Sequence, residues 1–272
     1  MSDAAQRTER YTHGHHESVL RAHSWRTVEN SAAYLAPFLR PGLDVLDVGS
    51  GPGTITVDIA RRVVPGRVVG LDAAPDVVEQ ATALARSEGL RTVEFTTGDA
   101  YALDFPDDSF DVVHAHQVLQ HVGDPVRALA EMRRVTRPGG LVAARDVVYS
   151  KVALFPESDG LRLWADVYLP VHRANGGEPD AGSRLKAWAR EAGFTDIESS
   201  ASVWCFSSDD ERAWWGGAWA DRAVASSFAG QALEGGFASD DDLQAIRAGW
   251  QEWAADADGF LAMPHGEVLA RR

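Results

Sequence analysis

The sequence of 272 residues contains one cysteine, Cys205, and no long apolar run. A single cysteine excludes an internal disulfide and a thiolate cluster for metal or arsenic chemistry. The N-terminus is polar and lacks an apolar signal core, and no uninterrupted apolar stretch is long enough to span a bilayer. We therefore expect a soluble, cytoplasmic protein with no membrane partner.

Basic residues are also scarce, since 26 Lys and Arg stand against 40 Asp and Glu, which gives a formal net charge of −14. Such a surface repels the phosphate backbone of nucleic acids, whose binding depends on Lys and Arg. It also repels an anionic membrane, and we find no basic amphipathic helix to offset this. The composition favours a small-molecule substrate over a nucleic-acid partner.

The most informative stretch is an apolar strand that runs into a glycine turn at residues 43–54. Val45, Leu46 and Val48 give it the apolar character of a buried parallel strand. Gly49, Gly51 and Gly53 permit positive φ, and without a Cβ atom they let a ligand approach the main chain. This turn is typical of a ligand-binding site.

The turn departs from the dinucleotide pattern Gly-x-Gly-x-x-Gly, because Thr54 replaces the last glycine and Pro52 removes an amide donor. A ligand without a diphosphate is therefore favoured. Asp72 ends the next apolar strand, a position from which a carboxylate accepts hydrogen bonds from both ribose hydroxyls. The pattern predicts a bound nucleoside.

Several motifs occurring together resemble the class I S-adenosylmethionine-dependent methyltransferases, and among them the small-molecule group that includes the ubiquinone and menaquinone biosynthesis enzymes. These motifs are Val45-Leu46-Asp47-Val48-Gly49-Ser50-Gly51-Pro52-Gly53-Thr54, Asp72, Gly98-Asp99-Ala100, Phe110-Asp111-Val112-Val113 and Arg137-Pro138-Gly139-Gly140. They cover about residues 30–150 in the order of that family. The resemblance implies S-adenosylmethionine as the cofactor and does not define the methyl acceptor.

The strand ends and the resemblance together indicate the cofactor-binding residues. Asp99 follows the third predicted strand, where it could accept from the adenine amino group while Ala100 donates its amide. In similar methyltransferases an N-terminal arginine pairs with the methionine carboxylate, and Arg26 is the candidate here, supported by Tyr11. The predicted cofactor-binding set is Tyr11, Arg26, Asp47, Gly49, Ser50, Gly51, Asp72, Ala73, Asp99, Ala100, His116 and Gln117.

Strand and helix signals alternate from residue 43 to residue 150, which predicts an α/β fold with a Rossmann-like, mostly parallel sheet. In the resembled family the sheet has seven strands and the last is antiparallel. We expect one domain over 1–272, with an N-terminal helical cap (1–40), a cofactor-binding core (41–150) and an acceptor-side half (151–272). In the cap, a helix capped by Ser24 or Thr27 is expected to reach about Leu39.

The acceptor-side half holds eight of the nine tryptophans. We expect a helix over 161–172, strands over 197–206 and 260–269, and between these strands a helical lid at about 207–255. One interpretation is that the tryptophans are core residues. Another is that some lie exposed on a mostly polar insertion, where they form a substrate pocket or a homodimer contact. We predict a pocket that includes His23, Trp164, Trp214, Trp215 and Trp219.

Methyl transfer from a sulfonium is an in-line displacement, so positioning and exclusion of water are the enzyme's main tasks. For an acidic acceptor atom, His116, His121, Asp146 and His23 are candidate bases by position. Neither the N-terminal histidines nor His114 and His116 come with carboxylate or thiolate ligands in a recognised spacing, so no metal is expected.

The leading hypothesis is methyl transfer to a small, largely apolar or aromatic metabolite, with oxygen, nitrogen and carbon acceptors all open. Quinone precursors and secondary metabolites fit this class. One alternative is a nicotinamide-dependent oxidoreductase that uses the glycine turn and Asp72. Another is a protein that binds S-adenosylmethionine without transferring its methyl group.

Overall fold

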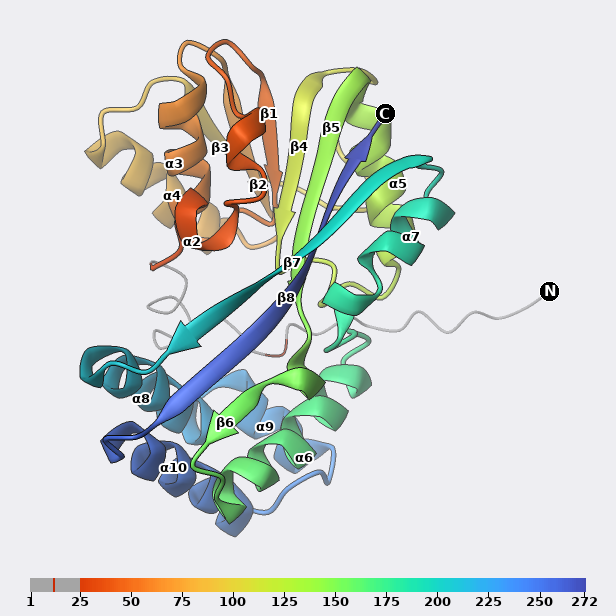
Figure 1. The fold of residues 1–272 in the computed structure, drawn as a ribbon. Helices are drawn as coiled ribbons and strands as arrows, with labels where there is room; N and C mark the ends of the chain where they lie inside the picture. Colours follow the sequence, from red (N-terminus) through yellow and green to blue (C-terminus); the bar gives the residue numbers. More distant parts are fainter. Residues whose placement is uncertain (1–11, 13–24) are drawn as a thin grey trace, which may run out of the picture.

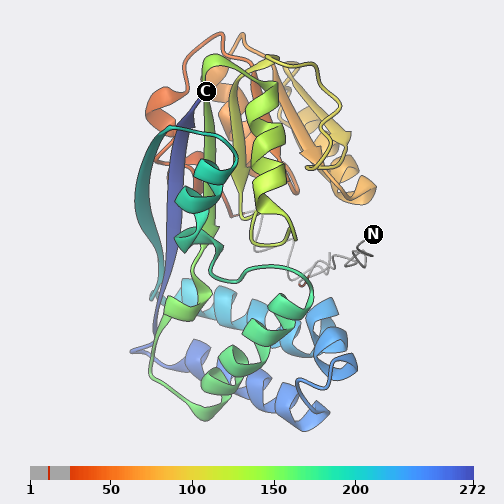
Figure 2. The same cartoon turned by 90° about the vertical axis from the view of Figure 1, so that its right-hand side faces the viewer.

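The computed structural model describes residue 12 and residues 25–272. These residues form two lobes joined by two long strands (Figures 1 and 2). One, the sheet lobe, contains most of the sheet and the helices that cover its faces. The other, the helical lobe, contains a short strand (residues 153–155) and helices over residues 159–174 and 209–255. In the part of the chain that the structure describes, no helix is both long and apolar enough to cross a membrane.

The sheet has eight strands, one more than predicted, in the order β3-β2-β1-β4-β5-β8-β6, and β7 pairs with β8. The first five strands are parallel, whereas β8 is antiparallel to β5, β6 and β7, which confirms the Rossmann-like fold with an antiparallel last strand. The strands are β1 (Val45–Val48), β2 (Val68–Asp72), β3 (Val93–Thr97), β4 (Phe110–His116), β5 (Thr136–Val147), β6 (Ala153–Phe155), β7 (Asp196–Phe206) and β8 (Phe260–Arg271).

Helices cover both faces of the sheet, as expected when crossover connections join parallel strands. Helices α2 (Val28–Ser31), α3 (Thr54–Val63) and α4 (Pro75–Ser87) lie on one face, and α5 (Pro125–Val135) and α7 (Leu185–Glu191) on the other (Figure 1). Short 3₁₀ helices are η1 (Ala36–Phe38), η2 (Tyr149–Lys151) and η3 (Ala181–Ser183). The predicted elements of the sheet lobe are present except for the long N-terminal helix.

The predicted N-terminal helix is much shorter than expected. Thr27 does cap it, since its hydroxyl accepts from Asn30 N at 3.3 Å, but α2 ends at Ser31 and only the 3₁₀ helix η1 follows. Pro37 lies within η1. Its ring would clash with the carbonyl four residues earlier and it offers no N–H, so one α-helix to Leu39 is unfavourable.

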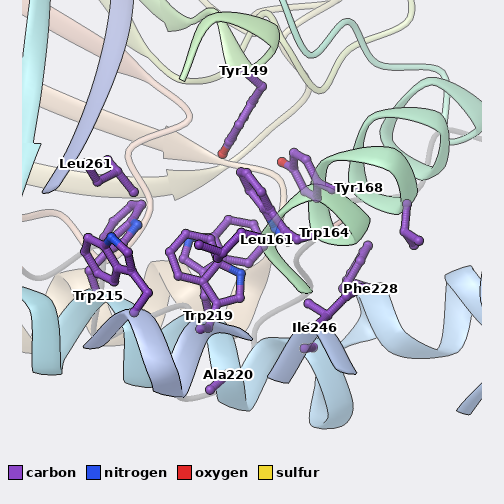
Figure 3. Packing of buried hydrophobic residues seen from close by; sticks show 14 of the residues in the cluster. Tyr149, Leu161, Trp164, Tyr168, Trp215, Trp219, Ala220, Phe228, Ile246 and Leu261 are labelled. Atoms are coloured by element: carbon purple, nitrogen blue, oxygen red, sulfur yellow. The ribbon is translucent and has the colours of Figure 1, made fainter. Parts of the chain in front are cut away.

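The helical lobe contains α6 (Asp159–Ala174), α8 (Asp209–Ala225), α9 (Ser227–Glu234) and α10 (Asp240–Ala255). Helices α8–α10 lie between β7 and β8, as predicted for residues 207–255. The expectation of a mostly polar insertion with a small core was wrong, because these helices, α6 and the strand ends enclose one large hydrophobic cluster. Its packed aromatic rings are shown in Figure 3.

Three of the tryptophans form the centre of that cluster. Trp164 meets Trp219 and Trp250 edge to face, at centroid distances of 5.0 and 5.1 Å, and Trp219 stacks on Trp250 at 5.7 Å. All three are at most 2% exposed. Edge-to-face and offset contacts of this kind stabilise a core beyond the area they bury. The interpretation as core residues is therefore correct for these three.

Candidate functional site

A cavity of about 710 Å³ lies at the carboxyl ends of β1, β2 and β4, where the two lobes meet. The sheet lobe contributes the glycine turn and the loops that follow β2, β3 and β4. The opposite wall is made of Trp215 and Arg222 on α8, Tyr149 on η2, Trp204 on β7 and Met263 on β8. Carboxyl strand ends are the usual binding edge of an open α/β sheet.

The glycine turn is held against the end of β2. The amides of Gly49 and Ser50 donate to Leu71 O at 2.7 and 2.9 Å, and the amide of Gly51 donates to Asp72 Oδ2 at 2.9 Å. Gly49 has φ +69°, and a Cβ atom there would lie 2.4 Å from Val118 Cγ2. Only glycine fits this position, because a side chain would be strained and would also clash.

Asp72 is half-buried beside this turn and lines the cavity. Its Oδ1 accepts from Ala74 N at 3.1 Å, and its Oδ2 accepts from Gly51 N at 2.9 Å. A carboxylate has about four acceptor positions, so both oxygens keep capacity for ligand hydroxyls. The two amide bonds fix the orientation of the carboxylate, as a ribose-binding residue requires.

The neighbouring carboxylates differ in position. Asp99 lines the cavity and is exposed, with one oxygen accepting from Tyr101 N at 2.8 Å. Asp47 is 3% exposed and uses both oxygens internally, because Thr56 Oγ1 lies 2.5 Å from Oδ2 and His114 Nδ1 lies 2.8 Å from Oδ1. Asp47 thus joins β1, α3 and β4 behind the glycine turn.

Gln117 connects three parts of the chain at the end of β4. Arg26 Nη2 donates to its Oε1 at 2.7 Å, and its Nε2 lies 2.9 Å from His265 Nε2 on β8. Its φ is +54°, an uncommon conformation for a residue other than glycine. Such strain is retained where surrounding contacts enforce it, often at functional sites. Arg26 and Gln117 both line the cavity.

His116 is 5% exposed and lines the same cavity. Neither ring nitrogen has a hydrogen-bond partner among the described residues. Burial, together with the charges of Arg26 and Arg145, holds the pKa of His116 well below its usual value of 6.5. The imidazole is therefore neutral at pH 7 and offers the cavity one donor and one acceptor.

A buried ion pair lies behind His116 on the same face of the sheet. Arg145 is paired in register with His116 on β4 and with Glu267 on β8, and its Nε lies 3.3 Å from Glu267 Oε1. Ser202 accepts from the same Nε at 3.0 Å. Desolvation lowers the pKa of Arg145 to about 10, so the side chain keeps its charge at pH 7.

His121 and Asp146 lie farther along this edge. His121 lines the cavity and stacks on His172 with ring centroids 5.0 Å apart, and burial and His172 hold its pKa well below the usual value. Asp146 is not a lining residue: it is fully buried and accepts from Gln120 N at 3.2 Å. Burial raises the pKa of Asp146 to about 8. Its position supports the loop after β4 and does not suit a base.

The chain is similar in sequence to known methyltransferases. A family model described as "Methyltransferase domain" matches residues 39–178. An uncharacterized methyltransferase of Schizosaccharomyces pombe is 33% identical over 273 residues, covering 96% of each chain. The probable methyltransferase LtbC of Aspergillus luteorubrus is 31% identical over 97% of each chain. The chain belongs to the class I S-adenosylmethionine-dependent methyltransferases.

Relatives that match part of the chain, and solved structures of similar fold, are consistent with this family. A ubiquinone/menaquinone biosynthesis C-methyltransferase of Bdellovibrio bacteriovorus is 35% identical over 49% of this methyltransferase and 54% of its own length. The YcgJ protein of Bacillus subtilis has the same fold, with a TM-score of 0.59 and 21% identity over 90% of this chain and 98% of its own. A Haemonchus contortus phosphoethanolamine N-methyltransferase in complex with S-adenosylmethionine aligns at a TM-score of 0.55 and 19% identity, covering 89% and 51%.

The cofactor of this methyltransferase is S-adenosylmethionine, and the residues present fit it. Asp72 suits the ribose hydroxyls, and the glycine turn beside it lines the cavity with little side-chain bulk. With the exception of Tyr11, which lies outside the described residues, the predicted cofactor-binding residues all line the cavity: Arg26, Asp47, Gly49, Ser50, Gly51, Asp72, Ala73, Asp99, Ala100, His116 and Gln117. Their individual roles stay predictions.

The predicted acceptor pocket needs correction. Trp215 lines the cavity, but Trp164 and Trp219 are core residues, and half-buried Trp214 packs against Trp25 and Phe206. His23 lies outside the described residues. Sequence reasoning missed Tyr149, Trp204, Arg222 and Met263. Tyr149 could have been found, since it closely follows the carboxyl end of β5, the edge where ligands bind.

The metal prediction stays a prediction. Over residues 25–272 together with Thr12, no three His, Cys, Asp or Glu side chains are grouped so that they could hold a metal ion. The N-terminal histidines that first suggested a metal, His13, His15 and His16, lie outside the described residues.

Proposed function

We propose that this methyltransferase transfers a methyl group to a small, largely apolar or aromatic metabolite by in-line displacement. The observation that supports this most strongly is the continuous cavity that leads from the glycine turn and Asp72, past His116, to a wall of Trp204, Trp215 and Met263. These three wall residues are at most 5% exposed. Aromatic and thioether side chains of this kind suit a flat apolar molecule.

S-adenosylmethionine, when bound, supplies the methyl group on a positively charged sulfur. The chain's own residues hold the acceptor in line and exclude water, which accounts for about 7–11 kcal/mol of barrier reduction in well-oriented reactions. Buried side chains from both sides of the cavity, among them His116 and Trp215, line it where the acceptor would lie. Positioning is therefore the main contribution of this fold.

His116 is the residue that we propose contacts the reacting group. Its ring nitrogens have no partner among the described residues, and the neutral imidazole can accept a proton from an acceptor hydroxyl, amine or carbon acid. His121 lies on the same cavity and is the second candidate. Asp146 does not line the cavity and accepts from Gln120 N, so we do not propose it as a base.

The relatives are consistent with an apolar acceptor without defining it. The name of a Lactococcus lactis enzyme, 35% identical over 43% of this chain, specifies demethylmenaquinone as its substrate. A quinone precursor or another aromatic secondary metabolite would fit the cavity wall described above. Family membership weighs against the nicotinamide-dependent oxidoreductase that the sequence left open.

The test is a turnover assay with S-adenosylmethionine carrying an isotopically labelled methyl group. Phenols, hydroquinones, indoles and aromatic amines are offered in turn, and products are followed by mass spectrometry together with formation of S-adenosylhomocysteine. We expect label in at least one aromatic acceptor, and at least tenfold less label with the Asp72→Ala variant at a subsaturating concentration of the cofactor. If the protein instead changes an acceptor while the cofactor remains unconsumed, it binds S-adenosylmethionine without transferring the methyl group.

A further inference from the structure

The outer face of the sheet in the helical lobe is apolar. Strand β8 lies between β6 and β7 there, and residues that are paired across strands point to the same face. The outer face consists of three such cross-strand rows: Phe155 and Phe260; Ala153, Ala262 and Cys205; and Pro264 and Val203. These seven residues include no Asp, Glu, Lys or Arg.

This outer face is open to solvent, whereas the inner face of the same strands is buried. Phe155 is 58% exposed, Val203 57% and Phe260 41%. Leu261 and Met263, which alternate with the outer residues of β8, belong to the hydrophobic cluster of the helical lobe. In Figure 2, β7 and β8 run along the left edge of the molecule, and the helices of the helical lobe lie to their right. Contiguous exposed apolar residues of this kind mark an interaction surface.

Charge indicates which partner suits this face. The whole chain has a formal net charge of −14, so most of its surface repels another acidic molecule, including an identical copy. The outer face lacks such charges, and the charges beyond its two ends differ in sign. Lys151 precedes β6, whereas Glu157 follows it, and Asp258 precedes β8 at that same end. Arg162 forms ion pairs with Glu157 and Asp159, at 3.1 and 2.6 Å, which leaves this end net acidic.

A second copy turned by a half rotation matches both the charges and the shape of this face. With the strands of the two copies antiparallel, the row of phenylalanines lies over the row of Pro264 and Val203 in the other copy. The middle row has small side chains and lies over itself, so the two sheets can approach closely. Lys151 of each copy then lies near the acidic end of the other. Such two-fold contacts, in which the same patch serves both subunits, are the commonest in homodimers.

We propose that two copies of this methyltransferase associate through this outer face, with β6, β7 and β8 of one copy stacked antiparallel on those of the other. The inference goes beyond methyl transfer and does not depend on the identity of the acceptor. Standard interfaces involve about 20–30 residues a side, and this face offers far fewer. The dimer is therefore weak, with a dissociation constant of about 10–100 μM.

The first test is the oligomeric state of the full chain. In sedimentation velocity, from micromolar to submillimolar protein, the sedimentation coefficient should rise with concentration to that of a dimer. Phe155→Asp places a carboxylate within the contact, so this variant should stay monomeric throughout. Val64→Asp is the matched control, because Val64 is 48% exposed but lies after α3 in the sheet lobe, and it should dimerise normally. Circular dichroism shows whether each variant is folded.

Charge variants test the orientation of the two copies. Lys151→Glu should weaken dimerisation several-fold, because a carboxylate then faces the acidic end of the other copy. Lys186→Glu makes the same change in net charge at an exposed position of α7 and should have little effect. If both variants dimerise equally well, the antiparallel arrangement is wrong.

Cys205 is an independent probe of the two-fold axis. It is exposed and is the single cysteine of the chain, so a bis-maleimide with a short spacer can join it only to a second copy. It lies in the middle row, which meets itself across the axis, and stacked sheets are about 10 Å apart. We expect a covalent dimer of the unmodified protein, and none with Cys205→Ser or Phe155→Asp.

Three outcomes would overturn the proposal. A sedimentation coefficient that stays at the monomer value over the whole range would leave this face to a different partner. A dimer that persists in Phe155→Asp, or that is not cross-linked through Cys205, forms through another surface. Equal loss of dimer in Phe155→Asp and Val64→Asp would show that the effect does not belong to the outer face.

Discussion

The side-chain amide of Gln117 lies 2.9 Å from the Nε2 atom of His265, a residue 148 positions later in the chain. His265 Nδ1 lies 3.0 Å from the carbonyl oxygen of Met263, which only accepts, so Nδ1 carries the proton and Nε2 accepts from Gln117. The same amide accepts from Arg26 through its oxygen. One side chain thus fixes the tautomer of His265 and the position of Arg26.

Replacing Gln117 by glutamate should therefore change the protonation of His265. A carboxylate cannot donate to Nε2, and its charge favours the imidazolium, so we expect the pKa of His265 to rise from its depressed value. Nitrogen chemical shifts of the labelled imidazole, followed over pH, would measure this. Gln117→Ala is the control that removes the donor without adding charge. An unchanged titration in the glutamate variant would contradict the tautomer assignment.

The Asp72→Ala variant should bind S-adenosylmethionine and S-adenosylhomocysteine at least tenfold more weakly, because it removes the acceptor for the ribose hydroxyls and releases the amides of Gly51 and Ala74. Calorimetric titration measures the loss. Asp76→Ala, which removes a nearby exposed carboxylate in the first turn of α4, is the matched control and should bind normally. Equal affinity in both variants would remove Asp72 from the cofactor site.

His116→Ala should lower kcat by about 10²–10⁴-fold if His116 accepts the proton of the acceptor. The base form is neutral, and burial holds its pKa well below 6.5. The rate of the unmodified enzyme should therefore stay constant as the pH falls to 6.5 and decline only below that value. Initial rates of S-adenosylhomocysteine formation test this, with cofactor affinity as the folding control. Undiminished turnover in the variant would remove His116 as the base.

Asp146→Asn should become more stable relative to the unmodified protein as pH rises. Burial raises the folded-state pKa of Asp146 to about 8, whereas the unfolded value is about 3.9. The folded protein therefore holds a proton that the unfolded chain has lost, and stability falls between these pH values by at most about 1.4 kcal/mol per unit. Urea unfolding of both proteins at pH 5, 7 and 9 measures the difference. A difference independent of pH would contradict the raised pKa.

Trp219→Ala should cost about 3–5 kcal/mol of unfolding free energy, because Trp219 is fully buried between Trp164 and Trp250. Trp214→Ala is the comparison within the same helix and should cost less, since Trp214 is half-buried. Denaturant unfolding measures both. If the two substitutions cost the same, Trp219 does not have the central packing role described here.

Local sequence patterns were sufficient to predict the sheet lobe and the cofactor. These patterns are local: the glycines at 49, 51 and 53, the acid at 72, and the alternating strand and helix signals. Each depends on interactions within a few residues. For this reason the strands from β1 to β5, the helix α3 and the positions lining the cofactor end of the cavity followed from the sequence.

The residues that face the acceptor side of the cavity could not be predicted without the packing of distant segments. The tryptophans of α6 and α8 look alike in sequence, yet Trp164 and Trp219 are core residues and Trp215 lines the cavity. That difference depends on how α6, α8 and α10 pack together, which is a contact between distant segments. The same holds for Arg222 beside Trp219 and for His265 beside Gln117, because their chemistry arises from neighbours that no local pattern specifies.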